Sequence, residues 1–161
     1  KHQVFGEWRE DKAQAQSAVL FARYPQARLV WSGNDLMAFG AMQAWQTQGG
    51  IPGKDALFSG INSSALALES VRQGQLSALA GGHFLAGAWA MVMLFDYHRG
   101  VDFIVEGLEQ QRPMFHLFNA ASSRQFEQSF APGVPLDFKP FSKYLHPRVQ
   151  CYDFNLHKLL Q

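Results

Sequence analysis

The sequence predicts an α/β fold, with a doubly wound parallel sheet followed by an irregular C-terminal tail rich in aromatic residues. Up to about residue 100, short apolar runs alternate with longer segments of helical periodicity. The apolar runs are continuous, as expected of parallel strands that are covered on both faces. Cap residues and glycines stand at the joints between them. We therefore expect an α/β lobe over residues 1–100, and a further strand with a tail over residues 101–161.

The expected elements follow one another in a strand-helix order. The predicted strands are short and apolar, at residues 4–8, 27–33, 56–61 and 76–80. The predicted helices lie between or after them, at residues 10–24, 36–47, 65–73 and 83–97. Pro25 closes the first helix, and Gly74 ends the third.

The pattern weakens after Gly100. Residues 113–118 form one more candidate strand, and residues 119–161 have no clear periodicity. Leaving the aromatic side chains of this tail in water would be costly, so we expect it to pack on the lobe or on a partner lobe absent from this chain. These aromatic residues are Phe126, Phe130, Phe138, Phe141, Tyr144, Tyr152 and Phe154.

The composition excludes several classes of function. The 161 residues carry a formal net charge of +1 with the charges scattered, so a nucleic-acid partner is not expected. The single cysteine, Cys151, forms no internal disulfide, and the Cys/His spacing matches no zinc site. No metal or cofactor is therefore expected. Residues Lys1–Trp8 lack the apolar core of a signal peptide, so a secreted protein would be seen here after processing or truncation.

The apolar stretch Ala78–Phe95 is near the lower length limit of a membrane span. Gly81-Gly82 interrupts it early and leaves too short a helix to cross a bilayer, so we expect buried core instead. Its larger side chains are expected to pack inside the protein: Trp89, Met91, Met93 and Phe95.

Polar and aromatic residues follow each predicted strand. In open α/β sheets ligands bind outside the carboxyl ends of the strands, so these residues are the candidate site. An indole, a guanidinium, carboxamides, a carboxylate and an imidazole suit a polyhydroxylated ligand, which needs donors, acceptors and a flat ring to pack on. The candidate ligand-binding residues are Trp8, Arg9, Asn34, Asp35, Asn62, Gly81 and His83.

Structural roles explain some of the same residues. Asn34 and Asp35 are also good helix caps, Trp8 could be a core aromatic, and His83 at a helix start could be a surface or capping residue. Asp96, His98 and Asp102 could bind a metal, but their spacing fits a solvated face as well. There is no ordered nucleophile and base, no carboxylate pair and no dinucleotide fingerprint, so no catalytic residues and no enzyme activity are expected.

Residues 28–44, RLVWSGNDLMAFGAMQA, resemble the Asn-Asp-x-Met-Ala-x-Gly-Ala segment of the type I periplasmic sugar-binding proteins. Residues 51–55, 59–62 and 69–78 match the same family in order and spacing, so the resemblance covers about Val4–Gly100. It implies that residues 1–100 are the C-terminal ligand-binding lobe of such a protein, and that the strand within residues 101–161 is its crossover strand. By the same resemblance, Asn34 bonds the ligand and Trp8 stacks on the sugar ring.

This sequence differs from the family pattern at two positions. Asn62 stands where sugar binders commonly have an aspartate, and Gly81 where many have a polar side chain. His83 and Trp31 are candidates to compensate.

The resemblance implies a periplasmic solute-binding component that closes two lobes over a small sugar-like solute and delivers it to an ABC transporter permease. The N-terminal lobe of the same protein would be the other partner. Two alternatives remain open: a periplasmic sensor lobe that signals to a histidine kinase or chemoreceptor, and the effector lobe of a lactose-repressor-like regulator.

Overall fold

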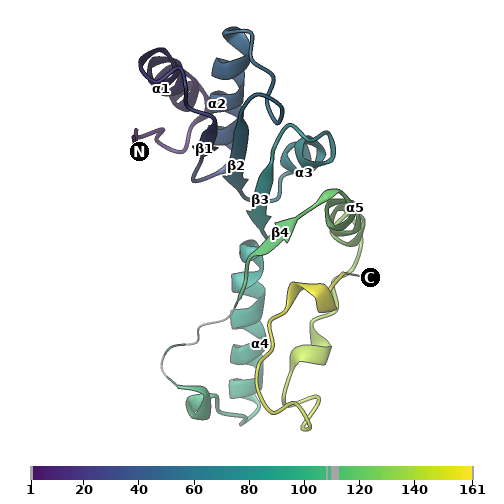
Figure 1. Cartoon of the computed structure of the whole chain (residues 1–161). Helices are drawn as coiled ribbons and strands as arrows, with labels where there is room; N and C mark the ends of the chain where they lie inside the picture. The colour runs from purple at the N-terminus through teal and green to yellow at the C-terminus, as the bar shows by residue number, and fades with distance from the viewer. Residues whose placement is uncertain (1, 108, 110–112, 161) are drawn as a thin grey trace. The chain divides into compact units, whose positions relative to one another are not determined.

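A computed structural model describes residues 2–107, 109 and 113–160 (Figure 1). The chain divides into two compact units, residues 1–81 with 117–127, and residues 82–116 with 128–161. The division predicted at residue 100 had placed the segment 82–98 with the first unit, whereas the structure groups it with most of the tail.

The first unit has the predicted alternation of strands and helices. In chain order it contains α1 (Glu10–Arg23), β1 (Leu29–Trp31), α2 (Asp35–Thr47), β2 (Leu57–Ile61), α3 (Ala65–Arg72) and β3 (Ala78–Gly81). The strand order is β1-β2-β3-β4, and both the β1–β2 and the β2–β3 pairs are parallel. The edge strand β4 (His116–Phe118) leads into α5 (Ala120–Ser129), a helix that the sequence pattern did not predict.

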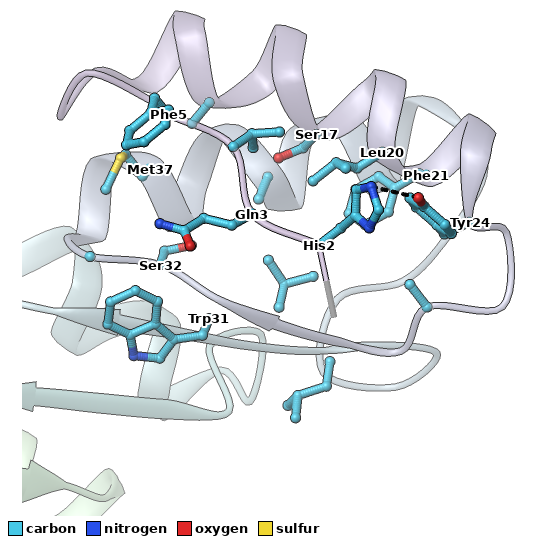
Figure 2. A pocket seen from close by; sticks show the side chains of 18 of the residues that line it. His2, Gln3, Phe5, Ser17, Leu20, Phe21, Tyr24, Trp31, Ser32 and Met37 are labelled. Carbon is cyan, nitrogen blue, oxygen red and sulfur yellow. Dashed lines mark hydrogen bonds between the residues drawn. The ribbon is translucent and has the colours of Figure 1, made fainter.

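The predicted strand 4–8 was wrong. Residues 2–6 have no strand pairing, and Glu7 and Trp8 have left-handed backbone angles, φ 52° and 59°. A strand needs extended angles, so the turn at Glu7–Trp8 ends any strand before Trp8. The N-terminal segment instead lies between α1 and β1 (Figure 2).

One face of the sheet packs against α2. Phe58 and Leu79 point to that face and are fully buried, and Gly60 lies against Ala38 of the helix. On the opposite face, Leu29 is 74% exposed and its cross-strand partner Leu57 is 47% exposed. The described residues therefore cover only one face of β1 and β2. The continuous apolar runs had predicted that both faces would be covered.

This exposed face leads to a prediction. Replacing both Leu29 and Leu57 with Thr should change the free energy of unfolding by no more than about 0.5 kcal/mol per site, because both side chains already face water. It should also reduce self-association of the chain in sedimentation measurements, because an apolar patch is removed. Phe58→Leu, on the covered face of the same strand, is the matched control and should cost about 1 kcal/mol. Equal losses at all three positions would contradict the assignment of the faces.

The second unit is built on the helix α4 (Ala86–His98), which follows the short 3-10 helix η1 (His83–Leu85). Trp89 of α4 is buried among aromatic rings of the tail, with ring centroids 4.8 to 5.2 Å away. These rings belong to Phe138, Phe141 and Phe154. Three further 3-10 helices, η2 (Ile104–Glu106), η3 (Lys139–Phe141) and η4 (Leu156–Lys158), also lie in this unit. The tail therefore packs on α4.

The core assignments within Ala78–Phe95 were right for Trp89 and wrong for two other residues. Met91 and Phe95 are exposed, because they lie on other sides of α4 from the aromatic cluster. No helix among the described residues is both long and apolar enough to span a bilayer.

Asp96 was assigned to a solvated face or a metal site, and the first assignment was wrong. It is 0% exposed, and its carboxylate accepts hydrogen bonds from the Lys143 backbone N–H at 2.7 Å and the Tyr152 hydroxyl at 2.9 Å. Ser142 donates to the same carboxylate. Burial and the bond to Asp96 raise the pKa of Tyr152 above its usual value. The described residues contain no group of three or more potential metal ligands.

His116 leads to a pH prediction. Its ring centroid lies 4.7 Å from that of His157. The pKa of His116 is lowered below its ordinary value of 6.5, mainly by burial and to a smaller extent by the charge of His157. Below that value the unfolded chain binds more protons than the folded one, so stability should decrease as pH falls through about 6.5 toward 5. Unfolding in urea at several pH values measures this decrease. His116→Phe should reduce it, and an unchanged pH dependence in that variant would contradict the assignment.

Candidate functional site

The turns after β1 and β2 lie at one edge of the sheet, because the two strands are parallel neighbours. Ser32 N–H donates to the Ser59 carbonyl at 3.1 Å, and Asn62 N–H donates to the Ala80 carbonyl at 2.9 Å. The strand pairing therefore continues to the first residue of each turn and fixes the residues that follow. The predicted site residues of the first unit are grouped at this edge.

Asn34 caps α2 and also holds Trp8. Its Oδ1 accepts from the Met37 backbone N–H at 2.8 Å, and its Nδ2 donates to the Trp8 carbonyl at 3.2 Å. Both ends of the carboxamide are thus fixed, while one Nδ2 hydrogen and one Oδ1 lone pair remain. Capping and ligand binding are compatible at this residue.

The indole of Trp8 is not part of the core. It is 67% exposed, and its six-membered ring lies beside Gly33, where a Cβ would come within 3.2 Å of it. A large exposed aromatic ring beside a fixed carboxamide is suited to pack on the C–H face of a sugar. Glycine at position 33 leaves room for this placement.

Arg9 forms an exposed ion pair with Asp11, with Nη2 2.7 Å from Oδ2. This hydrogen bond lowers the pKa of the Asp11 carboxyl below its usual value. Arg9 is therefore engaged within the chain, and its role toward a ligand stays a prediction.

Asp35 is buried at this edge, and its carboxylate accepts hydrogen bonds from residues of the turn after β2 and from the first turn of α2. It is 4% exposed, and its Oδ1 accepts from Asn62 Nδ2 at 3.0 Å and from the Leu36 backbone N–H at 3.0 Å. Its Oδ2 accepts from the Ser64 hydroxyl at 2.6 Å. Both oxygens are thus bonded within the chain, and a direct ligand contact of Asp35 stays a prediction.

Asn62 has an unusual backbone conformation, with φ 116°. Such an angle costs a residue other than glycine about 1–3 kcal/mol and persists only where neighbours hold it. The bonds to Asp35 and Ala80 do so here. A Cβ at Gly81 would overlap the Asn62 carbonyl, so glycine is required beside it.

His83 belongs to the second unit, where its ring stacks on Phe115 with centroids 4.8 Å apart. Its Nδ1 is buried without a hydrogen-bond partner among the described residues. Its ligand role, and the compensating role suggested for it and Trp31, stay predictions.

A cavity of about 1030 Å³ lies in the first unit, between the N-terminal segment, α1, β1 and α2. Figure 2 shows Phe5 and Met37 at one end, and the bond between His2 and Tyr24 at the other. Trp8 and Gly33 also line it, so the cavity adjoins the candidate edge. Its walls are mainly apolar, which is common in sites for small ligands.

No protein-family model and no curated protein matches the chain. Among solved structures, a periplasmic sugar-binding protein from Pseudomonas fluorescens is 42% identical, with a TM-score of 0.90 over 98% of this chain. The chain belongs to the periplasmic sugar-binding protein family. It spans 49% of the length of that relative. The predicted fold class and family resemblance are thereby confirmed.

Two further solved structures share the fold. One is the periplasmic binding protein of the arabinose ABC transporter from Shewanella sp. ANA-3, 23% identical over 78% of this chain and 41% of that one, with a TM-score of 0.55. The other is a periplasmic solute-binding protein of an ABC transporter from Actinobacillus succinogenes 130z with bound D-allose. It is 20% identical over 74% of this chain and 40% of that one, with a TM-score of 0.58.

Sequence reasoning missed the role of Ser64 at this edge. It is not among the predicted ligand-binding residues, and its hydroxyl accepts from the Ala67 backbone N–H at 3.3 Å, as a helix cap does. The same hydroxyl also donates to Asp35. A serine at the turn after β2 and an aspartate at the turn after β1 become neighbours once the strands are parallel, and this signal could have identified the pair.

Proposed function

We propose that the chain is the C-terminal lobe of a periplasmic solute-binding protein, which binds a sugar or polyol and delivers it to the permease of an ABC transporter. The observation that carries this proposal is the pairing of Trp8 with Asn34 at the carboxyl end of β1, in a chain 42% identical to a periplasmic sugar-binding protein. The role is binding, not catalysis, since the edge offers an aromatic ring and oriented amides.

The length of the relative, which is about twice that of this chain, supports a two-lobed arrangement. We propose that the ligand bridges this lobe and an N-terminal lobe of the same protein, and stabilises the closed state by binding it more tightly than the open one. One lobe supplies only one wall of the site. Affinity of the 161-residue chain alone should therefore be weak or absent.

The test is a thermal-shift screen of the complete protein against neutral sugars, polyols, amino acids and nucleosides, followed by calorimetric titration of each compound that raises the melting temperature. We expect a sugar or polyol to bind. Trp8→Ala should weaken binding at least tenfold by removing the stacking surface, which corresponds to about 1.4 kcal/mol. Asn34→Asp keeps the cap and should still weaken binding, because it removes the amide donor.

The matched control is Leu57→Ala, because Leu57 is exposed and is the first residue of β2, at the opposite end of that strand from the candidate edge. It should leave the affinity within about twofold of wild type. Binding of an amino acid or nucleoside, or binding that Trp8→Ala does not change, would contradict the proposal.

A further inference from the structure

The side-chain amide of Asn62 has a fixed direction. Its Nδ2 lies 3.0 Å from Asp35 Oδ1. If the side-chain amide were turned over, the Asn62 Oδ1 would lie against that carboxylate oxygen instead. Two acceptors at hydrogen-bond distance repel each other, so the amide cannot turn over without losing this bond. Its Oδ1 therefore lies on the side away from Asp35.

Ser64 fixes Asp35 in turn. Its hydroxyl donates to Oδ2 at 2.6 Å, while the Leu36 backbone N–H holds Oδ1. The carboxylate is nearly fully buried and has no freedom to rotate without breaking these bonds. A continuous chain of hydrogen bonds, called the relay below, thus joins Ser64 at the start of α3 through Asp35 to Asn62 in the turn after β2.

The Asn62 end of this relay is an acceptor. Asn62 is half-buried, and its Oδ1 has no hydrogen-bond partner among the described residues. Asn34, at the same edge, keeps one amide hydrogen as a donor. The two carboxamides therefore offer opposite hydrogen-bonding polarity, which a hydroxyl group can match because it both donates and accepts.

We propose that Asp35 and Ser64 are positioning residues that hold Asn62 Oδ1 as a hydrogen-bond acceptor for a hydroxyl of a neutral ligand. The inference rests on the proposed function and deepens it. It selects neutral polyhydroxylated ligands at this position and disfavours two others. A deoxy analogue has no hydrogen to donate, and a sugar acid would bring a carboxylate against the Asn62 oxygen.

The experiment uses the complete protein and two neutral probes, L-arabinose and D-allose, each with its monodeoxy and acid analogues. Affinities are measured by calorimetric titration for wild type, Asp35→Asn, Ser64→Ala and the double variant Asp35→Asn/Asn62→Asp. Asp35→Asn can hold Asn62 in either orientation and should weaken binding of the neutral probe about tenfold. It should also lower the ratio of the affinity for the neutral probe to the affinity for one of its monodeoxy analogues.

The double variant is the decisive arm. The amide at position 35 can donate to the carboxylate at position 62, so an acceptor oxygen again faces the ligand, and affinity should return to within about threefold of wild type. A purely structural role for Asp35 predicts no such rescue. Ser64→Ala should weaken binding less than Asp35→Asn. Asp55→Asn is the matched control, since Asp55 holds the Ile51 N–H in the loop before β2, and it should not change the affinity.

Each failure has its own meaning. If neither probe binds wild type, the proposed sugar function fails for these ligands, and the relay inference falls with it. If a probe binds wild type and Asp35→Asn binds it equally well while folded by circular dichroism, the relay alone is overturned. Loss of binding in Asp35→Asn without rescue in a folded double variant also overturns the relay.

Discussion

Asp96→Ala should lower the free energy of unfolding of the second unit by about 3–5 kcal/mol. The substitution leaves buried donors without their acceptor, among them the Lys143 N–H and the Tyr152 hydroxyl. Hydrogen bonds to a buried charge contribute about 1.5–3 kcal/mol each, and the losses are not fully additive. Because Asp96 joins α4 to the tail segments around Lys143 and Tyr152, the tail should detach first.

Urea unfolding followed by tryptophan fluorescence reports this loss, since Trp89 lies in the aromatic cluster of the same unit. The matched control is Asp153→Ala. Asp153 forms an ion pair with Lys158 in which both side chains are more than half exposed, so its removal should cost no more than about 0.5 kcal/mol. A similar small effect at Asp96 would show that its buried bonds do not stabilise the unit.

Gly40→Ala should lower the free energy of unfolding of the first unit by about 2–3 kcal/mol. Helices α1 and α2 approach closely at Gly40, where a Cβ would overlap the Glu10 carbonyl oxygen and lie 2.8 Å from the Gln14 backbone nitrogen. Backbone atoms cannot move aside as a flexible side chain can, so the two helices must separate. The higher helix propensity of alanine offsets only about 1 kcal/mol of this cost.

Gly87→Ala is the matched control, because Gly87 also lies within a helix and nothing lies within 4 Å of its Cβ position. It should stabilise the protein by about 0.5–1 kcal/mol. Opposite signs for the two variants in thermal or urea unfolding confirm the close approach of α1 and α2. Stabilisation by both would contradict it.

The alternation of strands and helices was predictable because each element carries its own local signal. Asn34 stands at a helix start and caps it as expected, and Ser64 caps the start of α3 in the same way. Parallel pairing then followed from the continuous apolar runs. The predictions failed for backbone turns and for residues that are buried by segments distant in the sequence. The left-handed angles at Glu7 and Trp8 and the buried position of Asp96 left no periodic signal in the sequence. The helix α5 was missed although Asn119 caps its start, where the Asn119 Oδ1 accepts from the Ala121 and Ser122 backbone N–H groups at 2.9 Å.

The candidate site shows the same division. Residues after the strands were identified individually, because parallel strands end at a common edge. Their bonding to one another was not, since the relay from Ser64 through Asp35 to Asn62 joins two separate turns. The exposed face at Leu29 also differs from expectation, because the pattern of a strand records what it can bury and not which segment covers it.

The most direct test of sugar binding at this edge is a crystal structure of the complete protein with the sugar that raises its melting temperature most. The account predicts a sugar ring packed on the Trp8 indole, with one hydroxyl within hydrogen-bond distance of Asn34 Nδ2 and another group bonded to Asn62 Oδ1. A sugar bound away from the carboxyl ends of β1 and β2, with Trp8 and Asn34 still in water, would contradict it.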